Sequence, residues 1–579
     1  MVAGKGSIKV NAKNIFPIIK KWLYSDKDIF ARELVVNGCD AITKLIKLKS
    51  LGEATYDEKP RIDVICDKDK RTITVKDNGI GMTEDEVKKY INQIAFSGAE
   101  EFLEKYKDQN EQNQIIGHFG LGFYSAFMVA KKVVIDTKSY TPEPAVRWTC
   151  SGGTEYTIAD SEKETIGTEI TLFVDDESDD FLIAEKMRSV LLKYCGFLPY
   201  EIFLDNEEKS VNDISPIWTK QPSECTDDEY KEFYHRIFSD INDPLLWIHL
   251  NVEYPFNLKG ILYFPKLTHE FDSAQGKIKL YNNQVFVADN IKEVIPEFLL
   301  LLKGVIDCPD LPLNVSRSAL QNDGTVSKIS AHITKKVADK LISTQKQQRE
   351  KFNEDWSDIA PFIEYGCLND EKFYERLKPI LQAKTTDGEY VTLVDYAKEN
   401  DNKMSYATDE NVQAQFIKML KEDGQKALLF PHIIDVHFIS FLEMKEKWKF
   451  TRIDTLPEQT SDNEKLLEIF KKALGKDDLT ITTADLKTNM PALIVQEEQM
   501  RRMSDFSKMF GNAKLPETFT LVLNSESKVI KQLPDIDDDK QAILCQQIYD
   551  IARLCNSSLS ADEMTGFIER SADLLEKIV

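Results

Sequence analysis

Apolar residues recur at helical spacing between residues 25 and 50. Their intervals of three, four and seven place them on one face of an α-helix, behind two aspartates whose carboxylates suit a helix N-terminus. The apolar positions are Leu34, Ala41, Leu45 and Leu48, and the aspartates are Asp26 and Asp28. The pattern predicts an amphipathic helix.

The pattern changes to alternation between Arg61 and Gly79. Apolar and polar residues alternate on both sides of a polar Asp-Lys-Asp-Lys turn at 67–70, as in a half-buried β-hairpin. Asp77 is therefore predicted to stand at the end of the second strand.

Further runs complete a first α+β unit, which we expect to end near Leu204. Strands are predicted within 145–150 and 167–174, and a helix within 181–195. A helical start is also predicted after residue 123. The polar segment 205–213 is the predicted first boundary.

A second α/β region is expected from Pro216 to the polar residues before Asn463, and the remainder is expected to be rich in helices. The second region has predicted strands within 247–256 and 260–265 and a helix at about 331–351. The remainder has predicted helices within 465–475, 545–555 and 564–579 and one strand within 518–524. The predicted domains are 1–208, 216–460 and 461–579, with a short linker at 209–215.

The composition is that of a large globular protein. The chain has 579 residues, of which 42% are hydrophobic and 30% charged, and this length exceeds what one hydrophobic core organises. Its formal net charge is −23. Because nucleic-acid affinity comes largely from lysine and arginine, we expect no nucleic-acid partner.

Cysteine and histidine spacing indicates no metal site. The nine cysteines include no Cys-x-x-Cys pair and the seven histidines no His-x-x-x-His pair, so we expect reduced thiols and no structural zinc. The first residues lack the apolar core of a secretory signal, and no apolar run is long enough to cross a bilayer. These features predict a cytoplasmic protein with no membrane partner.

Glu33 and Asn37 lie one helical turn apart on the first predicted helix. A carboxylate there could polarise a water while the amide oxygen completes a magnesium shell. The same spacing is common on solvated helix faces, so the pair alone decides nothing.

Two glycine-containing segments add to this signal. Residues 77–82, Asp-Asn-Gly-Ile-Gly-Met, put a carboxylate before glycines that allow close approach of a flat ring, although an ordinary Asn-Gly turn has the same sequence. Residues 117–123, Gly-His-Phe-Gly-Leu-Gly-Phe, could turn backbone amides toward phosphates, or could form a structural turn. The spacing is not that of a P-loop.

These signals and Gly167-Thr168 occur in an order that resembles the ATP site shared by heat-shock-protein-90 chaperones, type II topoisomerases, MutL proteins and sensor histidine kinases. Other segments resemble the chaperones alone: LYSDKDIFARELVVNGCDA at 23–41, KGILYFP at 259–265, LPLNVSRSALQ at 311–321 and FIERSADLLE at 567–576. The chain thus resembles the heat shock protein 90 family, in its bacterial HtpG type, almost end to end.

The resemblance implies an α+β multidomain fold. Its parts would be an N-terminal two-layer α/β sandwich of the gyrase, histidine-kinase and MutL ATPase type, an α/β middle domain, and a mainly helical C-terminal dimerisation domain. It also implies an ATP-dependent chaperone that works as a homodimeric clamp on unfolded or partly folded clients, with Mg²⁺-dependent ATP hydrolysis. A DnaK-type chaperone system is an expected further partner.

The family's functional residues can be carried over by position. Glu33 resembles the general base, Asn37 the magnesium ligand and Asp77 the adenine partner. The purine pocket would be lined by Gly81, Met82 and Thr168, with Ser97 and Gly98 nearby, and the loop over the phosphates by Gly117, Phe119, Gly120, Gly122 and Phe123. Residues 91–118 resemble the lid.

Two further parts of the chain match the family. Arg317 resembles the arginine that the second domain brings to the terminal phosphate, and Gln321 lies one helical turn beyond it. In the third domain, apolar residues three apart form a predicted client or dimer surface: Met500, Met503, Phe506 and Met509.

The chain also departs from the family pattern. Val36 replaces a serine expected near the adenine, Phe96 replaces the usual phosphate-contacting lysine, and His118 replaces a glutamine. Asn283 and Gln284 replace two arginines on a predicted strand. Losing one phosphate contact costs about 1 to 3 kcal/mol, so we expect a slow ATPase.

The segment 205–213 is shorter than the charged linker of eukaryotic relatives, and the sequence ends in LEKIV instead of MEEVD. We therefore expect no co-chaperones that grip such a tail. Two alternatives stay open: a DNA-directed ATPase of the MutL or gyrase kind, and a nucleotide-independent holdase whose ATP site has decayed.

Overall fold

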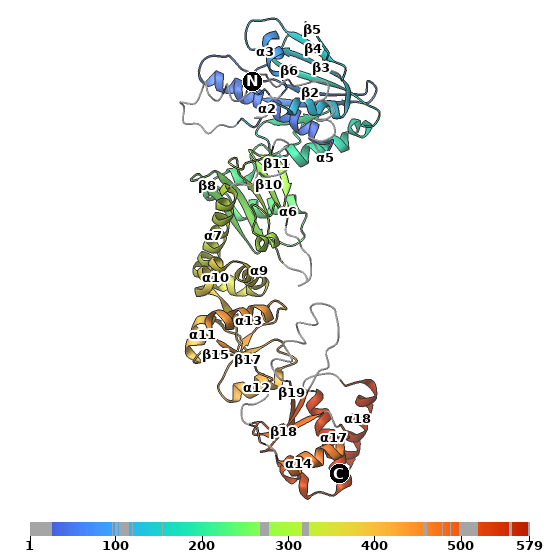
Figure 1. Cartoon of the computed structure of the whole chain (residues 1–579), viewed down its shortest axis with the longest axis vertical. Helices are drawn as coiled ribbons and strands as arrows, with labels where there is room; N and C mark the ends of the chain where they lie inside the picture. The colour runs from blue at the N-terminus through green and yellow to red at the C-terminus, as the bar shows by residue number, and fades with distance from the viewer. Residues whose placement is uncertain are drawn as a thin grey trace, which may run out of the picture. The chain divides into compact units, whose positions relative to one another are not determined.

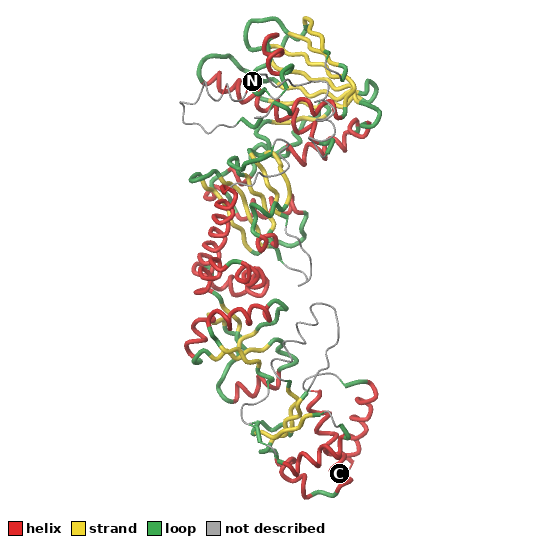
Figure 2. Tube along the Cα trace, in the orientation of Figure 1, coloured by secondary structure: helices red, strands yellow, loops and turns green. Residues whose placement is uncertain are grey.

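The computed structural model describes residues 26–94, 96–98, 102, 115–117, 120–152, 155–266, 277–314, 324–455, 460–461, 463–476, 479–486, 488–496, 519–554 and 559–576. The chain forms two compact units (Figures 1 and 2). The first comprises Met1–Lys266 and Ala274–Lys336, and the second comprises Leu267–Ser273 and Val337–Val579. The domain boundaries expected near 208 and 460 differ from this division and stay predictions.

A seven-stranded mixed sheet organises the N-terminal part of the first unit. Its strand order is β5-β4-β3-β6-β2-β1-β7, in which only β1 and β7 run parallel. The strands are β1 (Arg61–Asp67), β2 (Thr72–Asp77), β3 (Ala130–Lys138), β4 (Val146–Cys150), β5 (Tyr156–Asp160), β6 (Gly167–Val174) and β7 (Glu201–Leu204). The hairpin predicted from alternation is confirmed as β1 and β2.

Helices pack on this sheet and on one another. Helix α2 (Ile29–Ser50) contacts α5 (Ala184–Cys195) and the strands β1 and β2. The predicted amphipathic helix is thus confirmed, and its first ten residues are almost entirely buried. Short helix α3 (Glu84–Tyr90) begins with a capping box at Thr83. The predicted helix after residue 123 is the 3₁₀ helix η2 (Gly122–Met128), not an α-helix.

A five-stranded sheet with order β11-β10-β12-β9-β8 forms the rest of the first unit (Figure 1). Its strands are β8 (Leu246–Val252), β9 (Leu258–Phe264), β10 (Ile278–Asn282), β11 (Val285–Asp289) and β12 (Lys303–Asp307). Helices α6 (Asp227–Phe238) and α7 (Gly324–Gln347) accompany it. The strands predicted at 247–256 and 260–265 are confirmed.

The predicted linker is tied into the first unit by one asparagine. The Asn212 side chain accepts from the N–H of Ile202 at 2.8 Å and donates to the carbonyls of Leu198 and Tyr200, both at 2.8 Å. Beyond it, Trp218 packs edge-on against Phe197 at 4.5 Å between ring centroids. One hydrophobic core therefore continues across residues 205–213.

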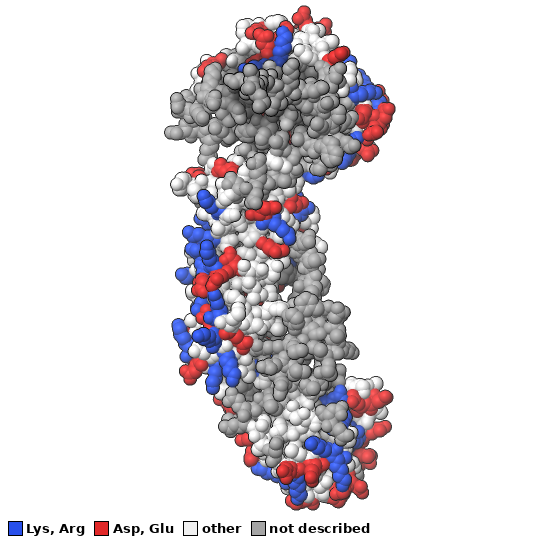
Figure 3. Space-filling model, in the orientation of Figure 1, with Lys and Arg blue, Asp and Glu red and all other residues white. Residues whose placement is uncertain are grey.

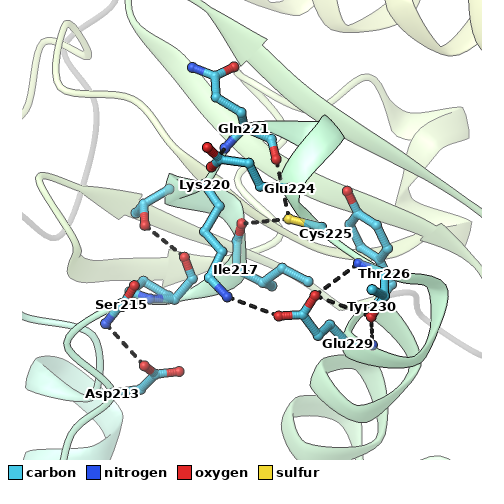
Figure 4. A network of polar contacts seen from close by, with 12 residues as sticks. Asp213, Ser215, Ile217, Lys220, Gln221, Glu224, Cys225, Thr226, Glu229 and Tyr230 are labelled. Atoms are coloured by element: carbon cyan, nitrogen blue, oxygen red, sulfur yellow. Dashed lines mark hydrogen bonds and ion pairs between the residues drawn. The ribbon is translucent and has the colours of Figure 1, made fainter.

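Polar contacts anchor the segment that follows this linker (Figure 4). Lys220 donates to Glu229 at 2.9 Å, and the same carboxylate accepts from the N–H of Thr226 at 2.8 Å, which caps α6. The Cys225 thiol donates to the carbonyl of Gln221 at 3.4 Å. These contacts hold the start of α6 and the segment that precedes it.

Asn283 and Gln284 lie in a turn and not on a strand. Their φ angles of 50° and 63° form a two-residue turn between β10 and β11, of the kind that suits a β-hairpin. The Gln284 N–H donates to Asp307 at 3.0 Å. The prediction that these two residues lie on a strand is therefore wrong.

The second unit begins with helices and short strands (Figure 1). The helices are α8 (Arg349–Glu354), α9 (Trp356–Asn369), α10 (Glu371–Leu377), α11 (Leu393–Glu399), α12 (Ala414–Glu422) and α13 (Asp435–Glu446). The strands are β13 (Gln382–Lys384), β14 (Tyr390–Thr392), β15 (Lys403–Ala407), β16 (Leu428–Leu429) and β17 (Lys449–Arg452). Strands β15, β16 and β17 form a parallel sheet.

The C-terminal part of the second unit contains more strands than the sequence predicts. Helices α14 (Glu464–Leu474), α17 (Asp538–Leu554) and α18 (Ala561–Glu576) confirm the predicted ones, and α16 (Lys528–Gln532) is a short addition. The predicted strand is β20 (Thr520–Asn524), which pairs with β18 (Thr480–Ala484) and β19 (Ala492–Val495). The two unpredicted strands are short: β18 is a threonine-rich Thr-Ile-Thr-Thr-Ala and β19 an apolar run of four residues, and neither carries enough periodicity to be recognised.

Acidic and basic side chains are interspersed over the described part of the face in Figure 3. Some form exposed ion pairs, such as Arg71 with Asp179 and Lys88 with Glu84, which contribute little stability individually. No helix among the described residues is long and apolar enough to span a membrane.

Candidate functional site

A cavity of about 420 Å³ lies in the first unit, between α2 and the inner strands β2 and β6 of the seven-stranded sheet. It brings together nearly every predicted site residue that the structure describes. These are Glu33, Asn37, Asp77, Gly81, Met82, Phe96, Ser97, Gly98, Gly117, Gly120, Gly122, Phe123 and Thr168. Segments separated by more than one hundred residues thus meet at one place.

One face of α2 forms a wall of this cavity. Glu33 and Asn37 lie on that face, and so do Asp40 and Lys44, each a further turn along the helix. Asp40 and Lys44 were not predicted from the sequence. Their spacing of three and seven residues from Asn37 is the signal that could have identified them.

The Glu33 carboxylate is buried and held on one side by its neighbour. Arg32 donates to Glu33 Oε1 through Nε at 2.9 Å and through Nη2 at 2.6 Å. The other oxygen lies beside Gly122, where a Cβ atom would come within 2.3 Å of Glu33 Oε2. Only glycine at position 122 leaves this carboxylate its present position.

The register of three neighbouring strands brings together a polar group that consists of Asp77, Thr168 and Thr137. Asp77, at the end of β2, pairs with Thr168 of β6, which in turn pairs with Thr137 of β3. The Thr137 and Thr168 hydroxyls are 3.0 Å apart. Burial raises the pKa of the Asp77 carboxyl to about 7, while N–H donors from Gly79 and Thr168 oppose the rise.

Hydrogen bonds join the segment after Asp77 to helix α2 and to strand β3. The N–H of Ile80 donates to the carbonyl of Ala41 at 3.1 Å, and the N–H of Met82 donates to the Thr137 hydroxyl at 2.9 Å. Gly81 has a φ of +63°, and a Cβ there would meet the Lys138 carbonyl oxygen at 1.8 Å. The turn therefore requires glycine at this position.

Asp40 holds the start of the glycine-rich loop. Its two carboxylate oxygens accept hydrogen bonds from the N–H groups of Ile116 at 2.8 Å and Gly117 at 2.7 Å. Charge-assisted bonds of this kind are stronger than neutral ones. Asp40 thus ties α2 to the loop, which continues to Gly120 against the backbone of Phe96.

Aromatic rings and lysines surround the position where a lysine was expected. Phe96 stacks on Tyr90 at 6.1 Å, and the Lys89 ammonium lies over both rings at 5.5 Å and 5.3 Å. Lys44 lies 5.8 Å from the Phe102 ring centroid. Burial lowers the pKa of Lys44, while the carboxylates of Asp40 and Glu86 oppose that effect.

Comparisons with known proteins agree with this geometry. Residues 30–170 match the model of the histidine kinase, DNA gyrase B and HSP90-like ATPase family. Residues 204–579, more than half of the chain, match the model of the Hsp90 protein family. The chain belongs to the Hsp90 family.

Relatives of this Hsp90 chain cover nearly its whole length. It is 44% identical to Chaperone protein HtpG of Bacteroides thetaiotaomicron over 92% of this chain and 85% of that protein. The values for the Porphyromonas gingivalis protein of the same name are 44%, 93% and 85%, and for that of Escherichia coli 33%, 91% and 92%. The protein is an ATP-dependent molecular chaperone, and its membership of this family implies client proteins and dimerisation.

The Hsp90 match also excludes the DNA-directed alternative. A DNA-directed ATPase shares the first family model but not the second, which covers residues 204–579. Val36, whose hydroxyl-lacking side chain was expected beside the adenine, lies fully buried in the hydrophobic core and does not line the cavity. The replacement of serine by valine at position 36 therefore affects the packing of the core.

Several predicted residues lie outside the described part of this Hsp90 chain. They are Phe119, His118, Arg317, Gln321, Met500, Met503, Phe506 and Met509. Their roles, like those of the cavity residues, stay predictions.

Proposed function

We propose that this Hsp90 chaperone binds ATP with Mg²⁺ in the cavity of the first unit and hydrolyses it slowly to drive a clamp cycle on client proteins. The observation that carries the proposal is the convergence of Glu33, Asn37 and Asp77 on one cavity of about 420 Å³, a volume within the usual range of small-molecule sites.

Glu33 is proposed as the general base. Its carboxylate is buried at 6% exposure, and Arg32 holds one oxygen so that the other faces the glycine-rich loop. In that position Glu33 orients a water and accepts its proton as the water attacks the terminal phosphate. The interaction with Arg32 fixes the direction of the carboxylate.

Asp77 is proposed to hold the adenine. Its carboxylate can accept a hydrogen bond from the exocyclic amine, while Gly81 lets the backbone approach the flat ring. Thr168 lies directly beside Asp77 on the neighbouring strand. These neighbouring groups would recognise the edge of the adenine ring.

Asn37 fits the role of a magnesium ligand. It is half-buried in the cavity wall one turn after Glu33, and an amide oxygen suits a hard cation that keeps most of its waters. Mg²⁺ would neutralise charge on the phosphate oxygens during hydrolysis. Asn37 would orient the ion relative to Glu33.

Lys44 is proposed to supply the positive charge that Phe96 does not. It lines the same cavity on the same face of α2, and its ammonium would pair with phosphate oxygens as a point charge. The aromatic pair of Phe96 and Tyr90 would then cover the phosphates from the side. This arrangement accounts for binding without the usual lysine.

The remaining partners belong to the same proposal. Arg317 would reach the terminal phosphate when the parts of the chain dock, so that hydrolysis times a change of shape. The protein would act as a homodimer in the cytoplasm, cooperate with a DnaK-type system and dispense with tail-binding co-chaperones.

Steady-state ATP turnover with and without Mg²⁺ tests the proposal, alongside refolding of a denatured client enzyme. Slow turnover would support the proposal if EDTA abolishes it and if it falls at least tenfold in Arg317→Ala. Refolding of the client should also require this turnover. Full refolding in the absence of nucleotide would instead support the holdase alternative. Turnover that persists in EDTA would exclude the role of Asn37.

A further inference from the structure

A second cavity of about 460 Å³ lies within the second unit, whereas the proposed nucleotide site belongs to the first. Four segments form it: residues 356–364 of α9, the hairpin of β13 and β14, the loop 408–411, and residues 429–435, which end at the first residue of α13. Its volume falls in the range of small-molecule sites.

Buried polar side chains form the floor of this cavity. Glu364, Gln382 and Asp435 are each at most 3% exposed. Asp435 accepts from the N–H of His432 at 2.7 Å, and Gln382 donates to Asn353 at 2.9 Å. Glu364 Oε2 receives no hydrogen bond from any residue that the structure describes.

Glu364 faces a second acid. Burial and the neighbouring Asp435 carboxyl raise the pKa of Glu364, and the two groups are close enough to share a proton. A buried carboxyl pair is costly, and apolar replacements of similar volume are often neutral or stabilising. A pair of acids that lines a cavity therefore points to a ligand that needs it.

The rest of the lining indicates the chemistry of that ligand. The exposed rim adds the carboxylates of Asp409 and Glu410, against the basic groups of Lys384 and of His432, whose Nδ1 lies 3.8 Å from Asp435 Oδ2. Asp409 also caps its own loop, accepting from the N–H of Asn411 at 2.8 Å. The wall contains the aromatic rings of Trp356, Tyr390 and Phe430. Carboxylates beside aromatic faces favour a planar cation that forms paired hydrogen bonds and stacks.

We propose that this cavity binds a small organic cation with an alkylguanidinium group, held at the floor by Glu364 and Asp435. The guanidinium N–H groups donate to both carboxylates, and the alkyl chain lies along the aromatic wall. Binding displaces the proton that the two acids share, and this proton leaves to the solvent. The guanidinium N–H groups thus take the place of the shared proton, and Glu364 Oε2, which accepts from no described N–H group, gains a donor of its own.

Isothermal titration of the full-length protein tests the proposal, with N-butylguanidinium as ligand and N-butylurea as its neutral analogue of the same shape. Wild type is expected to bind the guanidinium at least tenfold more tightly than the urea. Titrations in two buffers of different ionisation enthalpy should reveal about one proton released per bound ligand. N-butylammonium is expected to bind more weakly, because it lacks the planar fork.

Two variants and a control complete the test. Glu364→Gln should lower guanidinium affinity at least tenfold, and its circular dichroism checks that it folds. Glu410→Lys changes an exposed residue, so folding is not at risk, and it should weaken binding severalfold at low salt. Glu446→Gln removes a carboxylate of the same unit that lies outside the cavity and should leave affinity within twofold.

Equal affinity for guanidinium and urea, no binding by wild type at millimolar ligand, or unchanged affinity in folded Glu364→Gln would each overturn the proposal. Tighter binding of the ammonium would overturn the guanidinium assignment. None of these readouts depends on ATP turnover, so the result is independent of the nucleotide site.

Discussion

The Asp40 carboxylate accepts a hydrogen bond from the N–H of Gly117 at 2.7 Å, and so joins helix α2 to the glycine-rich loop. A second bond, from Ile116 at 2.8 Å, uses the other oxygen. The residue that holds the loop therefore lies on the same helix as the proposed base, Glu33. A change in the loop is thereby coupled to the helix that carries the proposed base.

Asp40→Asn should loosen this loop. The amide can accept only one of the two bonds and turns its own N–H groups toward the other donor, at a cost of about 1 to 3 kcal/mol. Hydrogen exchange at the amides of Ile116 and Gly117 should accelerate, and ATP should bind more weakly. Asp69→Asn, in an exposed turn, is the control. Unchanged protection of both amides would contradict the assignment.

Gly122→Ala should impair hydrolysis more than folding. The added methyl would meet Glu33 Oε2 at 2.3 Å, and misplacing a general base costs about 100-fold or more in rate. The expected result is a kcat lowered at least tenfold with an unchanged thermal midpoint. Gly324→Ala, where the methyl enters open space, should behave like wild type. Full activity of Gly122→Ala would show that Glu33 does not act from this position.

The raised pKa of Asp77 predicts a pH-dependent affinity. Because the carboxylate is proposed to accept a hydrogen bond from adenine, adenosine binding should strengthen as pH rises through about 7. Adenosine is the suitable ligand because it carries no titrating phosphate. Asp77→Asn should bind weakly at every pH, and a wild-type affinity that is flat between pH 6 and 8.5 would contradict the prediction.

The same group gives a stability prediction of opposite sign. The folded state keeps its proton up to about pH 7, whereas the unfolded carboxyl loses it near pH 4. The contribution of Asp77 to the free energy of unfolding is therefore fully present below about pH 4 and is lost as pH rises toward 7. Relative to wild type, Asp77→Asn should gain stability over this window in urea titrations without ligand. A constant difference between the two proteins would contradict it.

Phe96→Lys should strengthen ATP binding. An ammonium near the phosphates is worth about 1 to 3 kcal/mol, less the loss of the stack with Tyr90, which is worth about 0.5 to 1.5 kcal/mol. We expect a Kd for ATP several times lower than that of Phe96→Leu, which removes the ring without adding charge. Equal affinities would place the phosphates away from residue 96.

Lys44→Met should weaken ATP binding at least tenfold while changing adenosine binding by less than twofold. The substitution keeps the length of the side chain but removes the charge that would pair with phosphate. Calorimetry with both ligands measures the difference. A parallel loss of both affinities would indicate that Lys44 supports the cavity wall and not the phosphates.

Local patterns predicted much of the first unit. Helix α2 and the β1–β2 hairpin follow from the period of their apolar residues, and the ordered motifs identified the residues that line the nucleotide cavity. Asp40 and Lys44 were missed because they have no motif of their own, although their helical spacing from Asn37 places them on the same face. Strand β19 was missed because four apolar residues fit a strand and a helix equally well, and β18 because its threonine-rich segment has no run of apolar residues.

The second cavity could not be predicted from the sequence. Its walls come from segments between Trp356 and Asp435 that meet only through the packing of α9, α13 and the β13–β14 hairpin. In the sequence, Glu364 is one of many acidic residues. Only its burial beside Asp435 distinguishes it.

Glu33 is proposed as the base for hydrolysis of ATP bound in the first unit, and one variant tests this role by both binding and turnover. Glu33→Gln keeps the size of the side chain and its contact with Arg32 but cannot accept the proton. We expect a Kd for ATP within threefold of wild type and a kcat at least 100-fold lower. A kcat within tenfold of wild type, at unchanged affinity, would contradict it.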